Sequence, residues 1–96
     1  MRRLQFTPAA EQDLNEIWQY TVDLWGRQQA VQYVRDLKSS CQALARDKLI
    51  SQSAEHVRPG YRKAKSGKHV LYFRETNAVL IIVRILHERM DPDLNL

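Results

Sequence analysis

The sequence predicts an α+β fold in which an antiparallel two-helix hairpin covers one face of an antiparallel sheet. Two observations support this prediction. Apolar residues recur every three or four positions up to residue 45, and every second position after residue 60. The 96 residues are also 44% hydrophobic with only 3 Gly and 3 Pro, which indicates one globular domain over residues 1–96. The expected order of elements is β-α-α-β-β-β.

The chain is expected to begin with a short strand and to continue as a helix over residues 8 to 25. Leu4 and Phe6 alternate with polar residues, as in a half-buried strand. Thr7 is suited to the N-cap of the helix and Pro8 to its first turn. The apolar stripe of this helix comprises Ala10, Leu14, Ile17, Trp18, Thr21 and Trp25.

A second helix follows after only a short turn at Gly26, so the two helices should form an antiparallel hairpin. Cys41 lies on the apolar stripe of this helix, which favours a small buried side chain over a reactive thiol. A single cysteine cannot form an internal disulfide, which suits a reducing compartment. The stripe comprises Ala30, Val34, Leu37, Cys41, Leu44 and Ala45.

The period of two in the second half predicts a three-stranded antiparallel meander, preceded by a loop at residues 48–57. The last strand is apolar at nearly every position, which is typical of a central strand covered on both faces. A short polar tail follows, with one helical turn expected in it. The strands are expected at residues 61–65, 68–74 and 78–86, with turns at Ser66-Gly67 and Thr76-Asn77.

The helical hairpin is expected to cover only one face of this sheet. The core between hairpin and sheet should then contain Leu14, Ile17, Trp18, Leu37, Leu44, Val79, Ile81 and Val83. Leu80 and Ile82 alternate with these strand residues, so they should lie on the opposite face. An apolar face without a cover suggests a groove for a partner, so Leu80 and Ile82 are the predicted lining of that groove.

The positive charge is concentrated in the first two strands. The chain has 15 basic and 11 acidic residues, a net charge of +4, which suits either a polyanion or an acidic protein as partner. Arg and Tyr are favoured in binding surfaces, whereas Lys can simply keep a hairpin soluble, and both interpretations stay open. The basic stretch contains Arg58, Arg62, Lys63, Lys65, Lys68 and Arg74, with Tyr61, His69 and Tyr72 between them and no acidic residue.

Several classes of site are absent from the sequence. It has no Gly-rich phosphate loop, no nucleophile elbow and no His or Cys pair with metal-ligand spacing, so neither a cofactor nor a metal is expected. No apolar run is long enough to cross a bilayer, and a cytoplasmic protein is expected. No recognition-helix signature accompanies the basic stretch, which disfavours sequence-specific nucleic-acid binding.

The remaining chemistry would be that of a metal-free ribonuclease, which needs cations for the phosphorane charge and a positioned acid and base. Arg84 and His87 are candidates for these roles. In a regular strand, residues three apart lie on opposite faces, so Arg84 and His87 are not expected to meet. A purely structural role is also open, in which Arg84 pairs with Glu75 or Glu88 and His87 caps the strand end.

Four groups of segments match a known family, namely Trp25-Gly26 with Gln29-Ala30 and Tyr33, Arg58-Pro59-Gly60-Tyr61-Arg62, His69-Val70 with Tyr72 and Arg74, and Arg84-Ile85-Leu86-His87-Glu88-Arg89-Met90-Asp91. Through these segments nearly the whole chain resembles the ParE toxins of the RelE/ParE superfamily. The closing segment carries the part of the resemblance that is specific to the ParE branch. The resemblance implies the toxin of a bacterial type II toxin–antitoxin module that inhibits DNA gyrase by stabilising its cleaved DNA complex. It also implies a ParD-like antitoxin that neutralises the toxin in a hetero-oligomer.

The resemblance favours a non-catalytic inhibitor, with no residue in a catalytic role. The alternative is the RelE branch, which cleaves ribosome-bound mRNA with Arg and Lys on the sheet and a Tyr or His near the C-terminal end. Arg84 fits the last-strand arginine of that branch, but no tyrosine follows Tyr72, and His87 is the only acid–base candidate. The candidate gyrase- or partner-binding residues are Arg58, Tyr61, Arg62, Tyr72, Arg74, Arg84, His87, Arg89 and Met90, with Leu80 and Ile82 for the antitoxin groove.

Overall fold

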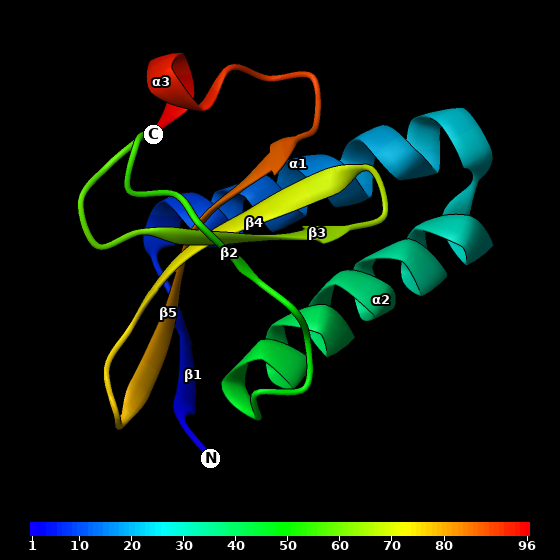
Figure 1. Cartoon of the computed structure of the whole chain (residues 1–96). Coiled ribbons are helices and arrows are strands. Elements are labelled where there is room, and N and C mark those ends of the chain that lie inside the picture. The colour runs from blue at the N-terminus through cyan, green and yellow to red at the C-terminus, as the bar shows by residue number, and fades with distance from the viewer.

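A helical hairpin lies across one face of a five-stranded sheet in the computed structural model, which describes residues 1–96 (Figure 1). This arrangement confirms the predicted α+β fold, but the sheet is mixed and not wholly antiparallel as predicted, because its first strand runs parallel to its last. The structure adds a short strand to the predicted set, and the first helix has the predicted bounds. The elements are β1 (Arg3–Phe6), α1 (Pro8–Trp25), α2 (Arg27–Ala45), β2 (Gln52–Ser53), β3 (Arg62–Ser66), β4 (His69–Glu75), β5 (Val79–His87) and α3 (Pro92–Asn95).

The strands are ordered β1-β5-β4-β3-β2, and β3, β4 and β5 form the predicted antiparallel meander. β1 pairs with β5 in parallel, with Leu4 opposite Leu80. The helical hairpin lies in the long connection that such a parallel pair requires. β2 pairs with β3 through Gln52 and Lys63, inside the stretch expected to be a loop. Two residues are too few to show a strand period, so the sequence could not reveal β2.

Local signals determine where the first helix begins and ends. The Thr7 hydroxyl accepts the Ala10 N–H at 3.1 Å as an N-cap and donates to the Val83 carbonyl at 2.7 Å, so it also joins α1 to the sheet. Gly26 ends the helix with φ of +92°. This left-handed conformation suits glycine, and it lets α2 begin at the next residue. No helix of the fold is both long and apolar enough to span a membrane.

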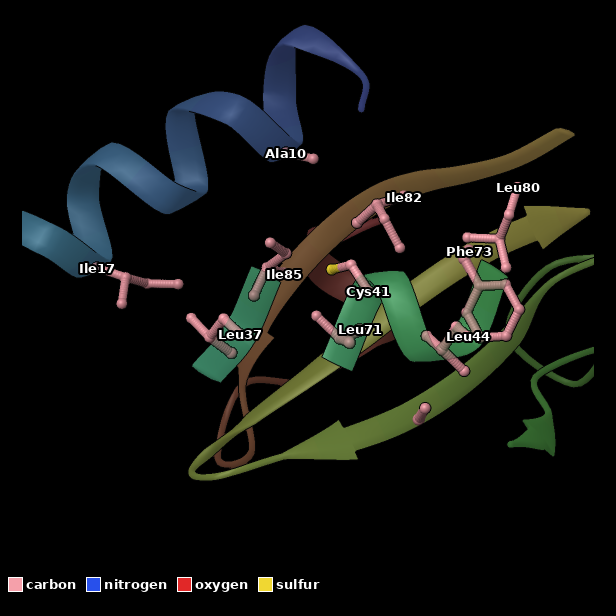
Figure 2. Packing of buried hydrophobic residues seen from close by; sticks show 11 residues of the cluster. Ala10, Ile17, Leu37, Cys41, Leu44, Leu71, Phe73, Leu80, Ile82 and Ile85 are labelled. Carbon is pink, nitrogen blue, oxygen red and sulfur yellow. The ribbon is translucent and has the colours of Figure 1, made fainter. Parts of the chain in front are cut away.

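The core lies between the two helices and the sheet, and Figure 2 shows its side chains. Ile17, Leu37, Leu44 and Cys41 are buried there, as predicted. Burial raises the pKa of Cys41 to about 12, so its thiol stays protonated and unreactive at neutral pH. The cluster comprises Ala10, Ile17, Leu37, Cys41, Leu44, Ala64, Leu71, Phe73, Leu80, Ile82 and Ile85.

The predicted phase of the last strand is wrong. Leu80 and Ile82 are 0% exposed and point into the core, so they cannot line an open groove (Figure 2). Val79, Ile81 and Val83, expected in the core, are only half-buried. A strand that is apolar at every position carries no alternation from which to choose the buried face, and a one-residue shift exchanges the two faces.

The predicted position of Trp18 is also wrong. Trp18 is half-buried in a groove between α1 and α2, beside Val31 and Val34, rather than against the sheet. The buried line of α1 comprises Ala10, Asp13, Ile17 and Thr21. Two of those four residues are polar, so the apolar residues of α1 are centred on a face nearer to Trp18 than the face that is actually buried. Leu14 is half-buried and packs at the margin of the core.

A β-bulge interrupts the pairing of β4 with β5. Tyr72 lies opposite Arg84 and Phe73 lies opposite Ile82, so Val83 has no opposing residue. The extra residue reverses the alternation of β5, because Ile82 and Ile85 both face the core although they are three apart. His87 consequently lies on the helix side of the sheet, where its ring meets that of His69.

The other face of the sheet carries a small cluster of Ala54, Tyr72 and Leu86. Leu96 packs against this cluster, so the tail returns over the face that the sequence predicted to be open. The tail includes the predicted helical turn, α3, whose N-cap is Asp91. Arg58 donates to the Leu96 carbonyl and holds the tail in place. We call this side the tail-covered face.

Candidate functional site

A cleft of about 690 Å³ lies between the end of the helical hairpin and the end of the sheet. The hairpin side is formed by the last turns of α1 and the start of α2. The sheet side is formed by the β3–β4 turn and by the residues after β5. We call it the hairpin-end cleft, and its main lining residues are Tyr20, Leu24, Trp25, Tyr33, Lys65, Lys68, His69, His87, Glu88 and Arg89.

A smaller pocket of about 480 Å³ adjoins the cleft and shares Tyr20, His69, His87 and Arg89 with it. It also contains Asp13, Arg84 and Met90. Four predicted site residues therefore meet here, namely Arg84, His87, Arg89 and Met90. The pairing from Arg84 to His87 is regular, with Arg84 opposite Tyr72 and His87 opposite His69, so the two residues lie on opposite faces of the strand as expected. Both still line this pocket, because the Arg84 guanidinium reaches Asp13 of α1 past the open edge of β5.

Tyr33 joins the hairpin to the sheet through His69. The Tyr33 hydroxyl lies 2.6 Å from His69 Nδ1 and accepts the Lys68 backbone N–H at 2.9 Å. The hydroxyl proton can then be donated to Nδ1, which places the ring proton of a neutral His69 on Nε2. A Cβ at Gly67 would lie 2.8 Å from the Tyr33 hydroxyl, and the φ of Gly67 is +60°. Glycine at the turn therefore permits the close approach of Tyr33.

His69 and His87 both line the cleft, and the His69 ring is uncharged at neutral pH. Burial, together with the neighbouring His87, lowers the pKa of His69 to about 4. Burial also raises the pKa of Tyr33. Both groups of the Tyr33–His69 hydrogen bond are therefore neutral at pH 7, and the two histidine rings meet edge to face at 5.4 Å.

Arg84 forms the only ion pair of this structure with a buried carboxylate. Its Nε and Nη2 donate to Asp13 at 2.8 and 2.9 Å, and Nη1 donates to the Asn95 carbonyl. The hydrogen bond to Asp13 raises the pKa of Arg84. The partner is neither Glu75 nor Glu88, the two carboxylates suggested by the sequence.

Asp13 also completes the open edge of β5. β1 ends beside Ile82, so the next edge groups of β5 have no strand partner. Thr7 pairs with two of these groups: its N–H donates to the Ile82 carbonyl and its hydroxyl donates to the Val83 carbonyl. The Ile85 N–H then donates to Asp13 Oδ2 at 2.9 Å. The start of α1 thereby satisfies the backbone groups that a longer β1 would have paired.

The segment after β5 carries exposed charges beside the cleft. Glu88 lies 3.1 Å from the Lys65 amine and 4.0 Å from that of Lys68, and the hydrogen bond from Lys65 lowers the pKa of Glu88. His87 Nδ1 accepts the Arg89 backbone N–H at 3.1 Å, which is the strand-end cap that the sequence suggested. Arg89 and Met90 themselves are exposed.

The other predicted site residues lie away from this cleft. Tyr72 is only 4% exposed and belongs to the tail-covered face, as does the half-buried Tyr61 that packs against its cluster. The Arg74 guanidinium lies 5.9 Å from the centre of the Tyr61 ring. Arg62 donates to the Ser51 hydroxyl and carbonyl, beside β2. Arg58 contacts the Leu96 carbonyl of the tail, whereas Lys65 and Lys68 line the cleft. The basic stretch of the sequence therefore does not form a single surface.

Sequence reasoning assigned no site role to several residues that shape the cleft, namely Asp13, Tyr20, Trp25, Tyr33, Lys65 and Lys68. Asp13 had a signal, because it shares the spacing of Ala10 and Ile17 on the buried line of α1. Tyr33 lies in a segment of the family resemblance and Lys68 in the basic stretch, but no local pattern indicates that the two meet. Their contact across 35 residues depends on the packing of the hairpin against the sheet.

Comparison with known proteins gives consistent results. The family described as "ParE toxin of type II toxin-antitoxin system, parDE" matches residues 4–92. Toxin ParE1 of Mycobacterium tuberculosis is 44% identical over 95 residues, which cover 98% of this chain and 97% of that protein. Toxin ParE1 of Caulobacter vibrioides is 33% identical over 96 residues, covering 100% and 99%. A chain from the solved chromosomal ParDE TA system of P. aeruginosa has a TM-score of 0.78 and 25% identity, with 91% of this chain and 96% of that chain covered.

Proposed function

The chain belongs to the ParE family of toxins from type II toxin–antitoxin systems, and we propose that it is a non-catalytic inhibitor of DNA gyrase that stabilises the enzyme's cleaved DNA complex. A ParD-like antitoxin neutralises it in the cytoplasm. The alternative for this superfamily is cleavage of ribosome-bound mRNA. The two activities demand different things from the residues around the hairpin-end cleft.

The observation that best supports inhibition over cleavage is the state of Arg84. A metal-free nuclease needs a cation free to meet the developing phosphorane charge. Asp13 holds the Arg84 guanidinium through two hydrogen bonds, and the Asn95 carbonyl accepts a third. His69 is neutral and is already hydrogen-bonded to Tyr33. The predicted cation of the last strand therefore serves the fold, which favours a binding role for the exposed Arg89 and Met90.

The antitoxin is proposed to bind the tail-covered face. Arg58 and Arg74 are exposed there, Tyr61 is half-buried beneath Arg74, and Arg62 and Lys63 lie at the adjoining edge of the sheet. An acidic antitoxin segment would complement these charges, and such complementarity chiefly accelerates association. Leu80 and Ile82 take no part in this surface, because they are buried in the core.

Gyrase assays with matched variants test the toxin's target. The wild-type chain should inhibit supercoiling and cause cleaved DNA to accumulate in gyrase reactions, and it should leave mRNA intact in a translating ribosome assay. Arg89→Ala and Met90→Ala should lose inhibition and still bind antitoxin, because both side chains are exposed. Lys48→Ala, an exposed residue away from the cleft, is the control and should stay active.

The histidine variant decides between the two activities. If His87 acted as a general acid or base, His87→Gln would reduce RNA cleavage by roughly 100-fold or more. For an inhibitor, His87→Gln should have only a mild effect, provided that the strand end stays folded. Ribosome-dependent cleavage by the wild type that is lost in His87→Gln would refute gyrase inhibition as the primary activity and establish the nuclease.

A further inference from the structure

The end of the helical hairpin exposes a group of large apolar side chains that the fold itself does not need. Tyr20, Leu24 and Trp25 are 66%, 56% and 65% exposed, and all three line the hairpin-end cleft. Tyr20 and Leu24 are four residues apart on α1, so they lie on one helix face. Exposed aromatic residues gathered at one concave site indicate a surface for recognition.

The opposite side of the cleft is cationic. The side chains of Lys65 and Lys68 are 66% and 76% exposed, and they share one carboxylate, that of Glu88. Arg89 also lines the cleft and forms no ion pair. Three cations therefore face one acid, an excess of two positive charges opposite the aromatic side of the cleft. Figure 1 shows the β3–β4 turn that carries Lys68 alongside the end of the hairpin.

This combination fits a nucleic acid better than an acidic protein segment. Cations suit the phosphates or carboxylates of either partner, but aromatic rings opposite the cations add the stacking platform that bases use. Bases inside a duplex stack on each other and present only their edges, so rings on the protein can stack only on unpaired bases. A volume of about 690 Å³ lies within the range of small-ligand pockets, and the open sides of the cleft would let a strand pass through.

We propose that the hairpin-end cleft binds unpaired DNA, with Trp25 and Tyr20 stacking on bases while Lys65, Lys68 and Arg89 contact phosphates. The proposal rests on the proposed action on gyrase, because a toxin that stabilises a cleaved DNA complex by holding strand ends would need a site for unpaired DNA. The contact is independent of sequence, since stacking and phosphate contacts do not read base edges.

Fluorescence anisotropy with a labelled single-stranded oligonucleotide, and with a duplex of the same sequence, tests this contact on the full chain. The wild type should bind the single strand more tightly than the duplex. Trp25→Ala should weaken single-strand binding by about 5- to 150-fold, and Trp25→Phe should retain most of it. Lys68→Gln should reduce the slope of log affinity against log salt by about 0.7.

Matched controls separate the cleft from general effects of charge and hydrophobicity. Lys48→Gln removes the same charge as Lys68→Gln, and Ile50→Ala removes an apolar side chain that is 89% exposed. Neither control should change binding of the single strand. Urea unfolding midpoints of all variants should match the wild type, because the substituted side chains are exposed.

Gyrase reactions with the same variants distinguish failure of this proposal from failure of the proposed function. Accumulation of cleaved DNA with the wild type but much less with Trp25→Ala supports the proposal. Equal accumulation with both proteins, or no binding of the single strand, overturns it while leaving gyrase inhibition intact. Loss of binding to DNA-free gyrase in Trp25→Ala would also overturn it, since the cleft would then contact protein. Absence of cleaved DNA with the wild type would instead refute the proposed function.

Discussion

The two faces of the sheet differ in how many side chains they bury. The helix-covered face buries 11 residues in one cluster, and its one buried charge, Asp13, is fully hydrogen-bonded. The tail-covered face buries three residues, and it carries the exposed Arg58 and Arg74. The helix-covered face therefore supplies most of the stability, while the tail-covered face is free to carry binding residues. Variants on the two faces should separate unfolding from loss of partner binding.

The sharpest version of this comparison uses two adjacent residues of β5. Leu80 is fully buried under the helices, whereas its neighbour Ile81 is half-buried on the tail-covered face. Leu80→Ala should lower the free energy of unfolding by about 4 kcal/mol, because it leaves a cavity in the core. Ile81→Ala should cost about half as much or less, since its site remains open to solvent. Urea denaturation measures both losses, and a larger loss for Ile81→Ala than for Leu80→Ala would show that the strand has the opposite phase.

The next effect concerns the buried carboxylate that supports the bulge. Asp13→Ala removes the partner of Arg84 and the acceptor of the Ile85 N–H, so the free energy of unfolding should fall by about 3 kcal/mol. Asp36→Ala is the matched control, because Asp36 is exposed on α2 and accepts only a bond from Gln32. It should change the free energy of unfolding by less than about 0.5 kcal/mol. Similar losses in both variants would contradict a supporting role for Asp13.

A smaller effect should appear as pH falls. The pKa of His69 is about 4 in the fold, below the ordinary value of 6.5, so the folded state favours the neutral ring. The unfolded chain therefore binds a proton first, and stability should decline as pH falls from about 6.5 to about 4. Partial solvent exposure limits the loss to on the order of 1 kcal/mol. His69→Gln should remove this component from the pH profile of urea midpoints, and an unchanged profile would show that His69 titrates normally.

The smallest expected effect lies on the tail-covered face. Leu96 is half-buried against the cluster of Tyr72 and Leu86, so Leu96→Ala should lower the free energy of unfolding by about 1 kcal/mol or less. Amide exchange should accelerate in α3 and stay unchanged in β1 if the tail is an independent cover. A loss comparable to that of Leu80→Ala would mean that the two faces contribute equally to stability.

Much of the fold was predictable because local signals were strong. The N-cap at Thr7, the break at Gly26 and the change of period after residue 60 correctly indicated both helices and the meander. The phase of β5 was not predictable, because Val79 to Val83 are all apolar. Thr7 and Asp13 contact β5 beside the bulge from more than 70 residues away in the chain. No local sequence pattern could indicate these contacts, so the bulge was not predictable.

The candidate site was less predictable than the fold for the same reason. Arg84, His87, Arg89 and Met90 were identified through the closing segment, which is contiguous in sequence. The basic stretch looked like one surface, but strand alternation and the β3–β4 turn direct Arg74 and Lys68 to different places. The aromatic side of the cleft comes from the end of the first helix. The sequence placed Trp25 on the apolar stripe of that helix, so it was not predicted to line a binding site.

The parallel pairing of β1 with β5 has a consequence for synthesis of the chain. The contact between Thr7 and Val83 spans 76 residues, so β1 leaves the ribosome long before its partner strand is translated. At bacterial and eukaryotic elongation rates of about 5–20 residues per second, this delay lasts roughly 4 to 15 seconds. During that time the inner surface of the nascent hairpin has no sheet to cover it. The emerging chain therefore exposes apolar surface until β5 has been translated, and this is the interval in which aggregation competes with folding.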